Sequence, residues 1–253
     1  MKPVLALLLC GLALPAHASS DTARALLDEG RYEAARTQAL SEDTMDGLLV
    51  AGEAMAAEIM LMRVDDPNDH ARDAVALAED ALSRDPGNAE ALFQRALHTG
   101  FRTRSSSAFA VLAKGLIGRT EAAIDAFAAA APDDPRADAL RGAWHLGIVR
   151  AAGDGRFGAS LEDGMAAYDR AVAARPDDIV VLGNYAFSLI VLDDPALRPR
   201  ARDLLQRIER AEPRGATQAE TRERMLRLLA VFDDPDALRE RARGLLNTEE
   251  TAG

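Results

Sequence analysis

The 253-residue chain contains one cysteine, Cys10, so it can form no internal disulfide. β-Branched residues are scarce, and no segment alternates apolar and polar residues for long enough to indicate a strand. Apolar residues instead recur at the three- and four-residue spacing of one helix face. These features predict an all-α protein whose stability rests on its hydrophobic core.

Long apolar runs are also missing after residue 18, where none reaches the roughly 20 residues that a membrane-spanning helix needs. Residues 1–18 read MKPVLALLLCGLALPAHA: a lysine, a short apolar run, a proline and a final Ala-His-Ala. This order is typical of a cleaved secretory signal peptide and predicts a periplasmic protein without an integral membrane span. A lipoprotein acylated on Cys10 is the weaker interpretation, because Leu9 precedes the cysteine where a small residue is required.

Sequence motifs of common catalytic and cofactor sites are absent. The chain has no HExxH zinc motif, no GxSxG nucleophile elbow, no phosphate-binding GxxxxGK[ST] loop and no dinucleotide-binding GxGxxG loop. We therefore expect neither an enzyme nor a bound cofactor.

Acidic residues gather between the predicted helices, where Asp-Asp-Pro occurs at 65–67, 133–135, 193–195 and 233–235. An aspartate there can accept hydrogen bonds from the free N–H groups of the next helix, and proline fits the first turn of that helix. The strongest metal candidate is the cluster Asp65, Asp66, Asp69, His70 and Asp73. Because it lacks the spacing of a calcium loop, we expect helix capping and no metal site.

Positive charge is in the minority: 30 Lys and Arg residues against 41 Asp and Glu residues give a net charge of −11. This balance argues against nucleic acid and against anionic membrane surfaces as partners.

The apolar periodicity and the turn residues predict a series of helices. The expected ranges are 20–29, 31–42, 44–62, 67–84, 88–100, 107–131, 136–150, 160–175, 178–192, 196–211, 216–231 and 235–246. Either Gly115 or Gly118 can break the long range 107–131.

A repeat runs through these helices. Four small residues each lie twelve positions before a proline at a helix–helix turn; the pairs are Ala74 and Pro86, Ala123 and Pro135, Gly164 and Pro176, and Ala201 and Pro213. The segments AVALAEDALSRDPGNAEALFQRAL (74–97) and GMAAYDRAVAARPDDIVVLGNYAF (164–187) resemble the tetratricopeptide repeat, a helix–turn–helix unit of about 34 residues. Because the prolines are 49, 41 and 37 residues apart, the array is a divergent one.

The resemblance implies an α-solenoid, a right-handed superhelix of antiparallel helix pairs. Residues 19–253 would form one domain of about five pairs preceded by a partial repeat. In such arrays the first helix of each pair lines a concave face that holds a peptide, a helix or another protein. The residues that take these helix positions are Leu92, Arg95, His98, Trp144, Asn184 and Ser188. For Trp144 and its neighbour His145, a packed, hydrogen-bonded pair is the other interpretation.

Two connections are longer and richer in glycine and serine than a tight turn requires, namely GFRTRSSS (100–107) and AAGDGRFGAS (151–160). Loops within successive repeats share one edge of a solenoid, so we expect these two segments to be neighbours there. They would bring together a basic and aromatic spot of Phe101, Arg102, Arg104, Arg156 and Phe157, suited to an anionic group on a partner. The plainer interpretation is that these arginines only keep flexible loops soluble.

The function predicted first is a non-enzymatic periplasmic scaffold or adaptor that binds another envelope protein or a peptide. The chain is also similar to the helical T-component of tripartite (TRAP-type) solute transporters, which implies a ligand-binding role as the alternative. The oligomeric state stays open.

Overall fold

The computed structural model describes residues 17–250, with side chains for residues 21–245. Thirteen α-helices and two short 3₁₀ turns make up the described part, which contains no strand, so the all-α prediction is confirmed. The predicted signal peptide falls almost wholly outside the described residues. No helix within residues 17–250 is both long and apolar enough to cross a membrane. The α-helices are α1 (His17–Asp28), α2 (Tyr32–Leu40), α3 (Met45–Met60), α4 (Pro67–Arg84), α5 (Ala89–Arg104), α6 (Ala108–Ala113), α7 (Leu116–Ala130), α8 (Arg136–Ala152), α9 (Leu161–Ala174), α10 (Ile179–Val191), α11 (Arg198–Arg210), α12 (Gly215–Leu229) and α13 (Pro235–Glu250); the 3₁₀ turns are η1 (Arg156–Gly158) and η2 (Pro195–Leu197).

The Asp-Asp-Pro triplets cap helices as the sequence predicts. The Asp66 carboxylate accepts hydrogen bonds from the backbone N–H groups of Asn68 and Asp69, both at 2.9 Å, at the start of α4. The second aspartate of each other triplet, Asp134, Asp194 or Asp234, accepts equivalent bonds from the turn that follows it. These aspartates therefore satisfy N–H groups that would otherwise lack a partner.

The segment GFRTRSSS does not form the loop expected from its composition. Helix α5 continues to Arg104 because hydroxyl groups bond back to carbonyls one turn earlier: Thr99 to Arg95, Thr103 to Thr99, and Ser105 to Phe101. Such bonds let threonine and serine stay within a helix. Residues 105–107 then form a short turn before α6, and Gly115, with a φ of 59°, separates the short α6 from α7.

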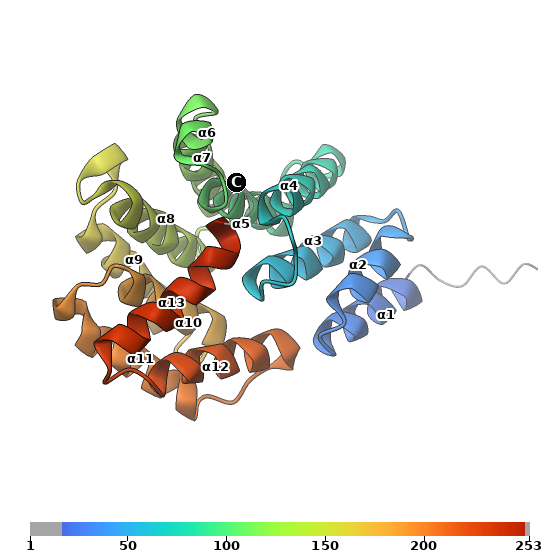
Figure 1. Ribbon diagram of the computed structural model, residues 1–253. Helices are drawn as coiled ribbons and strands as arrows, with labels where there is room; N and C mark the ends of the chain where they lie inside the picture. The colour runs from blue at the N-terminus through green and yellow to red at the C-terminus, as the bar shows by residue number, and fades with distance from the viewer. Residues whose placement is uncertain (1–16, 251–253) are drawn as a thin grey trace, which may run out of the picture.

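The helices pack in two rows (Figure 1). In the first row, which we call the inner helices, α1, α3, α5, α8, α10 and α12 contact one another in that order, and α12 contacts α1 in turn. The outer helices α2, α4, α7, α9 and α11 each pack against the inner helix before and the inner helix after them. Helix α13 packs on α10 and α12, whereas α6 packs on α7. The inner row is thus a closed circuit of helices.

The circuit closes where α12 meets the turns that follow α1 and α3. The Tyr32 hydroxyl donates to the Glu220 carboxylate at 3.2 Å, and Arg63 donates to the same carboxylate at 2.6 Å. From α12, Arg224 donates to two backbone carbonyls at the end of α3. We call Tyr32, Arg63, Glu220 and Arg224 the closing contact.

Two glycines let α8 and α9 approach closely. A Cβ on Gly142 would lie 2.5 Å from the Tyr168 ring, and one on Gly164 would lie 2.7 Å from Leu146. The Tyr168 ring stacks on Tyr185 of α10, with centroids 4.6 Å apart and planes 5° from parallel. Small residues that face large ones therefore join α8, α9 and α10 within the largest cluster of the core.

Candidate functional site

The accessible residues of the inner helices form stripes at helical spacing. Neighbouring inner helices cover the two sides of each helix, outer helices cover its back, and α13 also packs on α10 and α12; the accessible stripes are what these contacts leave uncovered. We call the following residues the inner face: Leu49, Glu53 and Met60 on α3; Leu140, Ala143 and Gly147 on α8; Val180, Asn184, Phe187 and Val191 on α10. These side chains are mostly apolar, and each is either partly buried or exposed; the exposed Asp46 continues the stripe on α3, and the exposed Arg150 continues the stripe on α8. A surface with this composition can take an apolar segment and offers few polar groups to orient it.

Glu53 is the acidic group of the inner face. Its side chain is 55% exposed and lies 3.5 Å from Arg24. Desolvation by the surrounding helices nevertheless raises the pKa of Glu53; the carboxylates of Glu90 and Asp28 raise it further, and Arg24 and Arg136 oppose the change. This carboxylate favours a cationic group on whatever the inner face binds.

Tyr168 on α9 is hydrogen-bonded to Ser188, next to the accessible stripe of α10. Burial raises the pKa of Tyr168 to about 12, although a hydrogen bond to Ser188 lowers it. The Ser188 hydroxyl also donates to the Asn184 carbonyl at 2.7 Å. Asn184 is exposed and Ser188 is partly buried, so these two predicted residues lie together, and the Asn184 amide is the accessible polar group.

Three of the predicted concave-face residues belong to the core instead. Leu92 and Trp144 are 7% and 9% exposed, and His98 is fully buried. The Trp144 indole donates to the Ile117 carbonyl at 3.3 Å, which ties α8 to α7. These side chains fill the space between helices and are not accessible to a partner, while the sixth residue, Arg95, is half-buried.

His98 is a structural group of the α3–α5 contact. Its Nε2 donates to the Gly52 carbonyl at 3.1 Å, and burial lowers its pKa to about 4. Beside it, Gln94 donates to the Leu49 carbonyl at 2.7 Å, and a Cβ on Gly52 would lie 2.0 Å from the Gln94 side chain. Gly52 therefore permits this close approach.

The predicted basic and aromatic spot is not assembled. Phe101 is 7% exposed, and the Arg104 guanidinium lies over its ring at 5.1 Å. Arg102 is half-buried. The turn with Arg156 and Phe157 projects beyond α8, well apart from the end of α5 and from α6 (Figure 1). The two predicted loops lie apart because the first of them, 100–107, is largely helical and extends α5 toward α6.

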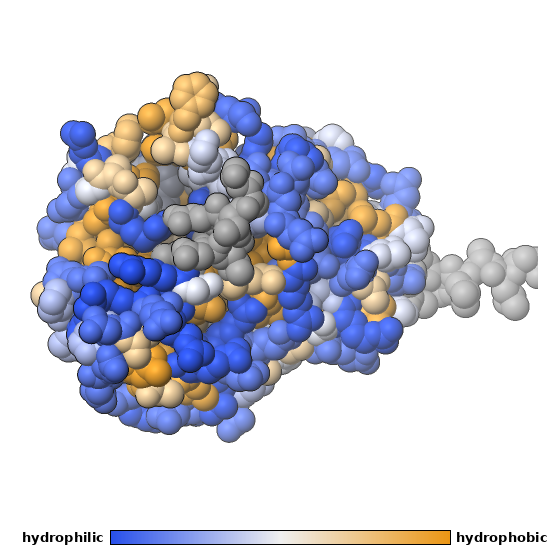
Figure 2. All heavy atoms as spheres, in the orientation of Figure 1, coloured by the Kyte–Doolittle hydropathy of each residue, from blue (hydrophilic) through white to orange (hydrophobic). Residues whose placement is uncertain are grey.

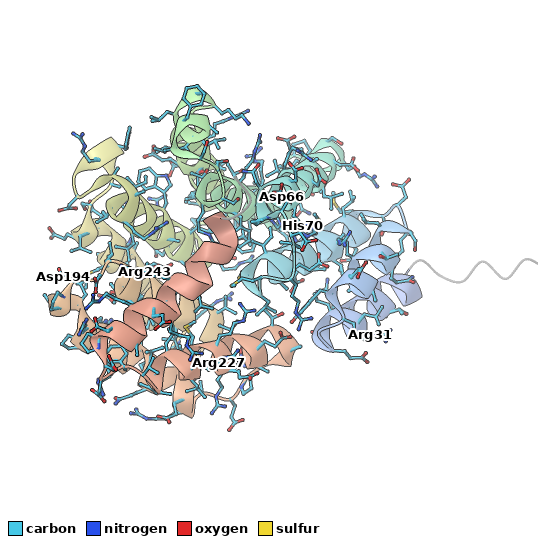
Figure 3. All side chains as sticks on the ribbon, viewed as in Figure 1. Arg31, Asp66, His70, Asp194, Arg227 and Arg243 are labelled. Carbon is cyan, nitrogen blue, oxygen red and sulfur yellow. The ribbon has the colours of Figure 1, made fainter. Side chains whose placement is uncertain are left out.

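An open pocket of about 240 Å³ lies at the turn between α1 and α2. Behind it the buried Glu58 accepts a hydrogen bond from Arg36 at 3.1 Å and lies 2.8 Å from His70 Nε2. Burial alone would raise the pKa of Glu58, but the hydrogen bond with His70 and the charge of Arg36 outweigh it and lower the pKa. His70 and Asp66 share the start of α4 (Figure 3), and the described residues contain no metal-binding group of three or more ligands. The pocket is lined by Gly30, Arg31, Tyr32, Glu33, Ala34, Glu58 and Arg63.

Sequence reasoning missed Glu53 and Phe187, although each carried a signal. Glu53 is a lone carboxylate in the middle of the apolar stretch GLLVAGEAMAA, and a charge there has to face an accessible surface. Phe187 shares the i, i+4, i+7 stripe of Val180 and Asn184.

Comparison with protein-family models and with curated proteins finds no match for the chain.

Proposed function

We propose that this protein is a non-enzymatic, exported scaffold of the cell envelope that binds a segment of another protein on its inner face. In this proposal the helix pairs form a right-handed superhelix of tetratricopeptide-like repeats. The observation that carries the proposal is the composition of the inner face: partly exposed apolar side chains from several helices, with one amide and one carboxylate among them.

The bound segment is expected to be apolar with a basic residue. Phe187, Val180 and Val191 on α10 offer apolar contacts along about three helical turns. Glu53 on α3 offers a partly exposed negative charge, so a lysine or arginine of the partner would add an ion pair beside the one that Glu53 makes with Arg24. An amphipathic helix with one cation in its apolar stripe meets both requirements.

The second candidate is a ligand-binding component of a solute uptake system. The closing contact favours it, because a closed circuit of inner helices surrounds the inner face and suits a small apolar ligand better than a folded partner. Both proposals use the same inner-face residues. The experiment therefore has to show whether a protein or a small molecule binds there.

Photocrosslinking in living cells tests the scaffold. A photoreactive residue replaces Asn184 on the inner face, and in a matched control it replaces Glu79, which is exposed on the outer helix α4. We expect a discrete protein adduct from position 184 and none from position 79. The Glu53→Arg substitution should weaken the adduct, since it reverses the charge that the partner meets.

Two outcomes would contradict the scaffold. Equal adducts from both positions would mean that the inner face is not the binding surface. No adduct from position 184, together with a small molecule that native mass spectrometry finds on the parent and not on an Asn184→Arg variant, would favour the ligand-binding component.

A further inference from the structure

The short helix α6 projects from the molecule with its apolar side chains uncovered. All six of its residues, AFAVLA, are apolar, and none of them is buried. Phe109 is 82% exposed and Leu112 is 62% exposed, and their i, i+3 spacing places both on one side of the helix. Figure 2 shows apolar atoms at this projection, at the top of the view where Figure 1 places α6.

Basic residues surround this projection on an otherwise acidic chain. Between Glu90 and Glu121 the sequence has no aspartate or glutamate and has five arginines or lysines. Among these, Arg104, Lys114 and Arg119 are exposed and flank α6 on both sides along the chain.

Acidic residues of other helices stand at the start of α4, where Asn68 donates to Ser106 at 2.6 Å, and at Glu121 on α7, the helix on which α6 packs. Two of them already have partners, since Asp66 caps α4 and Asp69 pairs with Arg72. Along the chain from residue 91 to residue 120 the charge is therefore positive, opposite in sign to the net charge of −11.

We propose that α6 is a peripheral membrane anchor that inserts Phe109 and Leu112 into the surface of an anionic lipid bilayer. Apolar side chains with adjacent cations are the combination that binds such interfaces. The net charge of the chain does not prevent this, because charges more than about 10 Å from the surface are largely screened at physiological salt. The anchor would hold the scaffold against the membrane.

The shape of the projection favours lipid over a protein partner. The two exposed side chains offer an apolar area on the order of 250 Å², well below the roughly 800 Å² that each partner buries in a standard protein interface. A convex tip of this size would also need a matching cavity in a protein, whereas lipid headgroups move apart to admit single side chains.

Vesicle co-sedimentation tests the anchor on the full chain. We expect the parent to bind vesicles of phosphatidylglycerol and phosphatidylcholine and to bind pure phosphatidylcholine vesicles much less. The double variant Phe109→Ser, Leu112→Ser should bind at least about tenfold more weakly, and Lys114→Glu about fivefold more weakly on the anionic vesicles only. The matched control is Leu40→Ser, which removes another exposed leucine (41% exposed) at the end of α2 and should change nothing. Any contribution from residues 1–16 is common to all variants and cancels.

A tryptophan reporter gives the position of the contact. In a Trp144→Phe background, Phe109→Trp should be quenched by brominated lipid and shift its emission to the blue, whereas Leu40→Trp should not. Equal binding by the parent and the double variant, or equal quenching at positions 40 and 109, would overturn the proposal. A parent that binds no vesicles and self-associates through α6, with the double variant monomeric in sedimentation velocity, would also overturn it and identify α6 as a protein contact.

Discussion

The close approach of α8 and α9 predicts opposite effects for the same substitution at two positions of one helix. Gly142 and Gly147 both lie on α8, but an added Cβ would lie 2.5 Å from the Tyr168 ring at Gly142 and meets no atom within 4 Å at Gly147. Because alanine is a better helix former than glycine by about 1 kcal/mol, Gly147→Ala should stabilise the fold by about that amount.

Gly142→Ala gains the same helix propensity but forces the Tyr168 ring out of a buried stack. Overpacking of this kind costs about 1–3 kcal/mol. Since Tyr168 is held between α8 and Tyr185 and cannot easily turn aside, we expect the upper part of that range and a net destabilisation of about 1–2 kcal/mol.

Urea unfolding and thermal unfolding of both variants measure the difference. The melting temperature should rise by about 2–4 °C in Gly147→Ala and fall by about 2–8 °C in Gly142→Ala. In a Tyr168→Leu background the cost of Gly142→Ala should shrink, because the ring that it displaces is gone. Equal shifts of the same sign at both glycines would refute the argument that Tyr168 requires a glycine opposite it.

Further predictions concern buried histidine, helix capping and the closing contact. Burial lowers the pKa of His98 to about 4 while the unfolded chain keeps a value near 6.5, so stability that is complete above pH 6.5 should fall by up to about 3 kcal/mol as the pH drops from 6.5 toward 4; urea titrations at several pH values should show a flatter dependence in His98→Gln. Asp66→Ala removes the cap of α4 and should lower the free energy of unfolding, measured with urea, by about 1 kcal/mol. The control substitution Asp65→Ala, at the exposed preceding residue, should lower it much less. Arg224→Met removes the bonds to the end of α3, so hydrogen exchange should speed up in α12 and at that end of α3; Arg227→Met, at an exposed position on the same helix, is the control and should leave exchange there unchanged.

The sequence predicted the helices well because periodicity and turn chemistry are local. The Asp-Asp-Pro caps and the range 67–84 agree with the structure for that reason. The segment 100–107 was misread because serine and threonine favour turns on average, yet here their hydroxyls bond back within α5.

Predicting which side of a helix is accessible was harder. His98 and Trp144 are polar or amphipathic residues, which suggested an exposed face, but both direct their N–H groups to backbone carbonyls of neighbouring helices. Carbonyl partners of this kind depend on tertiary packing and leave no trace in the periodicity of the chain. The sequence also placed Asn184 on an accessible face, and this residue is exposed in the structure.

The closing contact also has a consequence for how the chain folds. Most helices contact neighbours that are close in sequence, so most of the structure can assemble through short loops. The bonds of Tyr32 and Arg63 to Glu220 instead join residues 188 and 157 positions apart. Such contacts form at a high entropic cost and are polar, so the circuit should close after the helix pairs have formed and should open first when the protein unfolds.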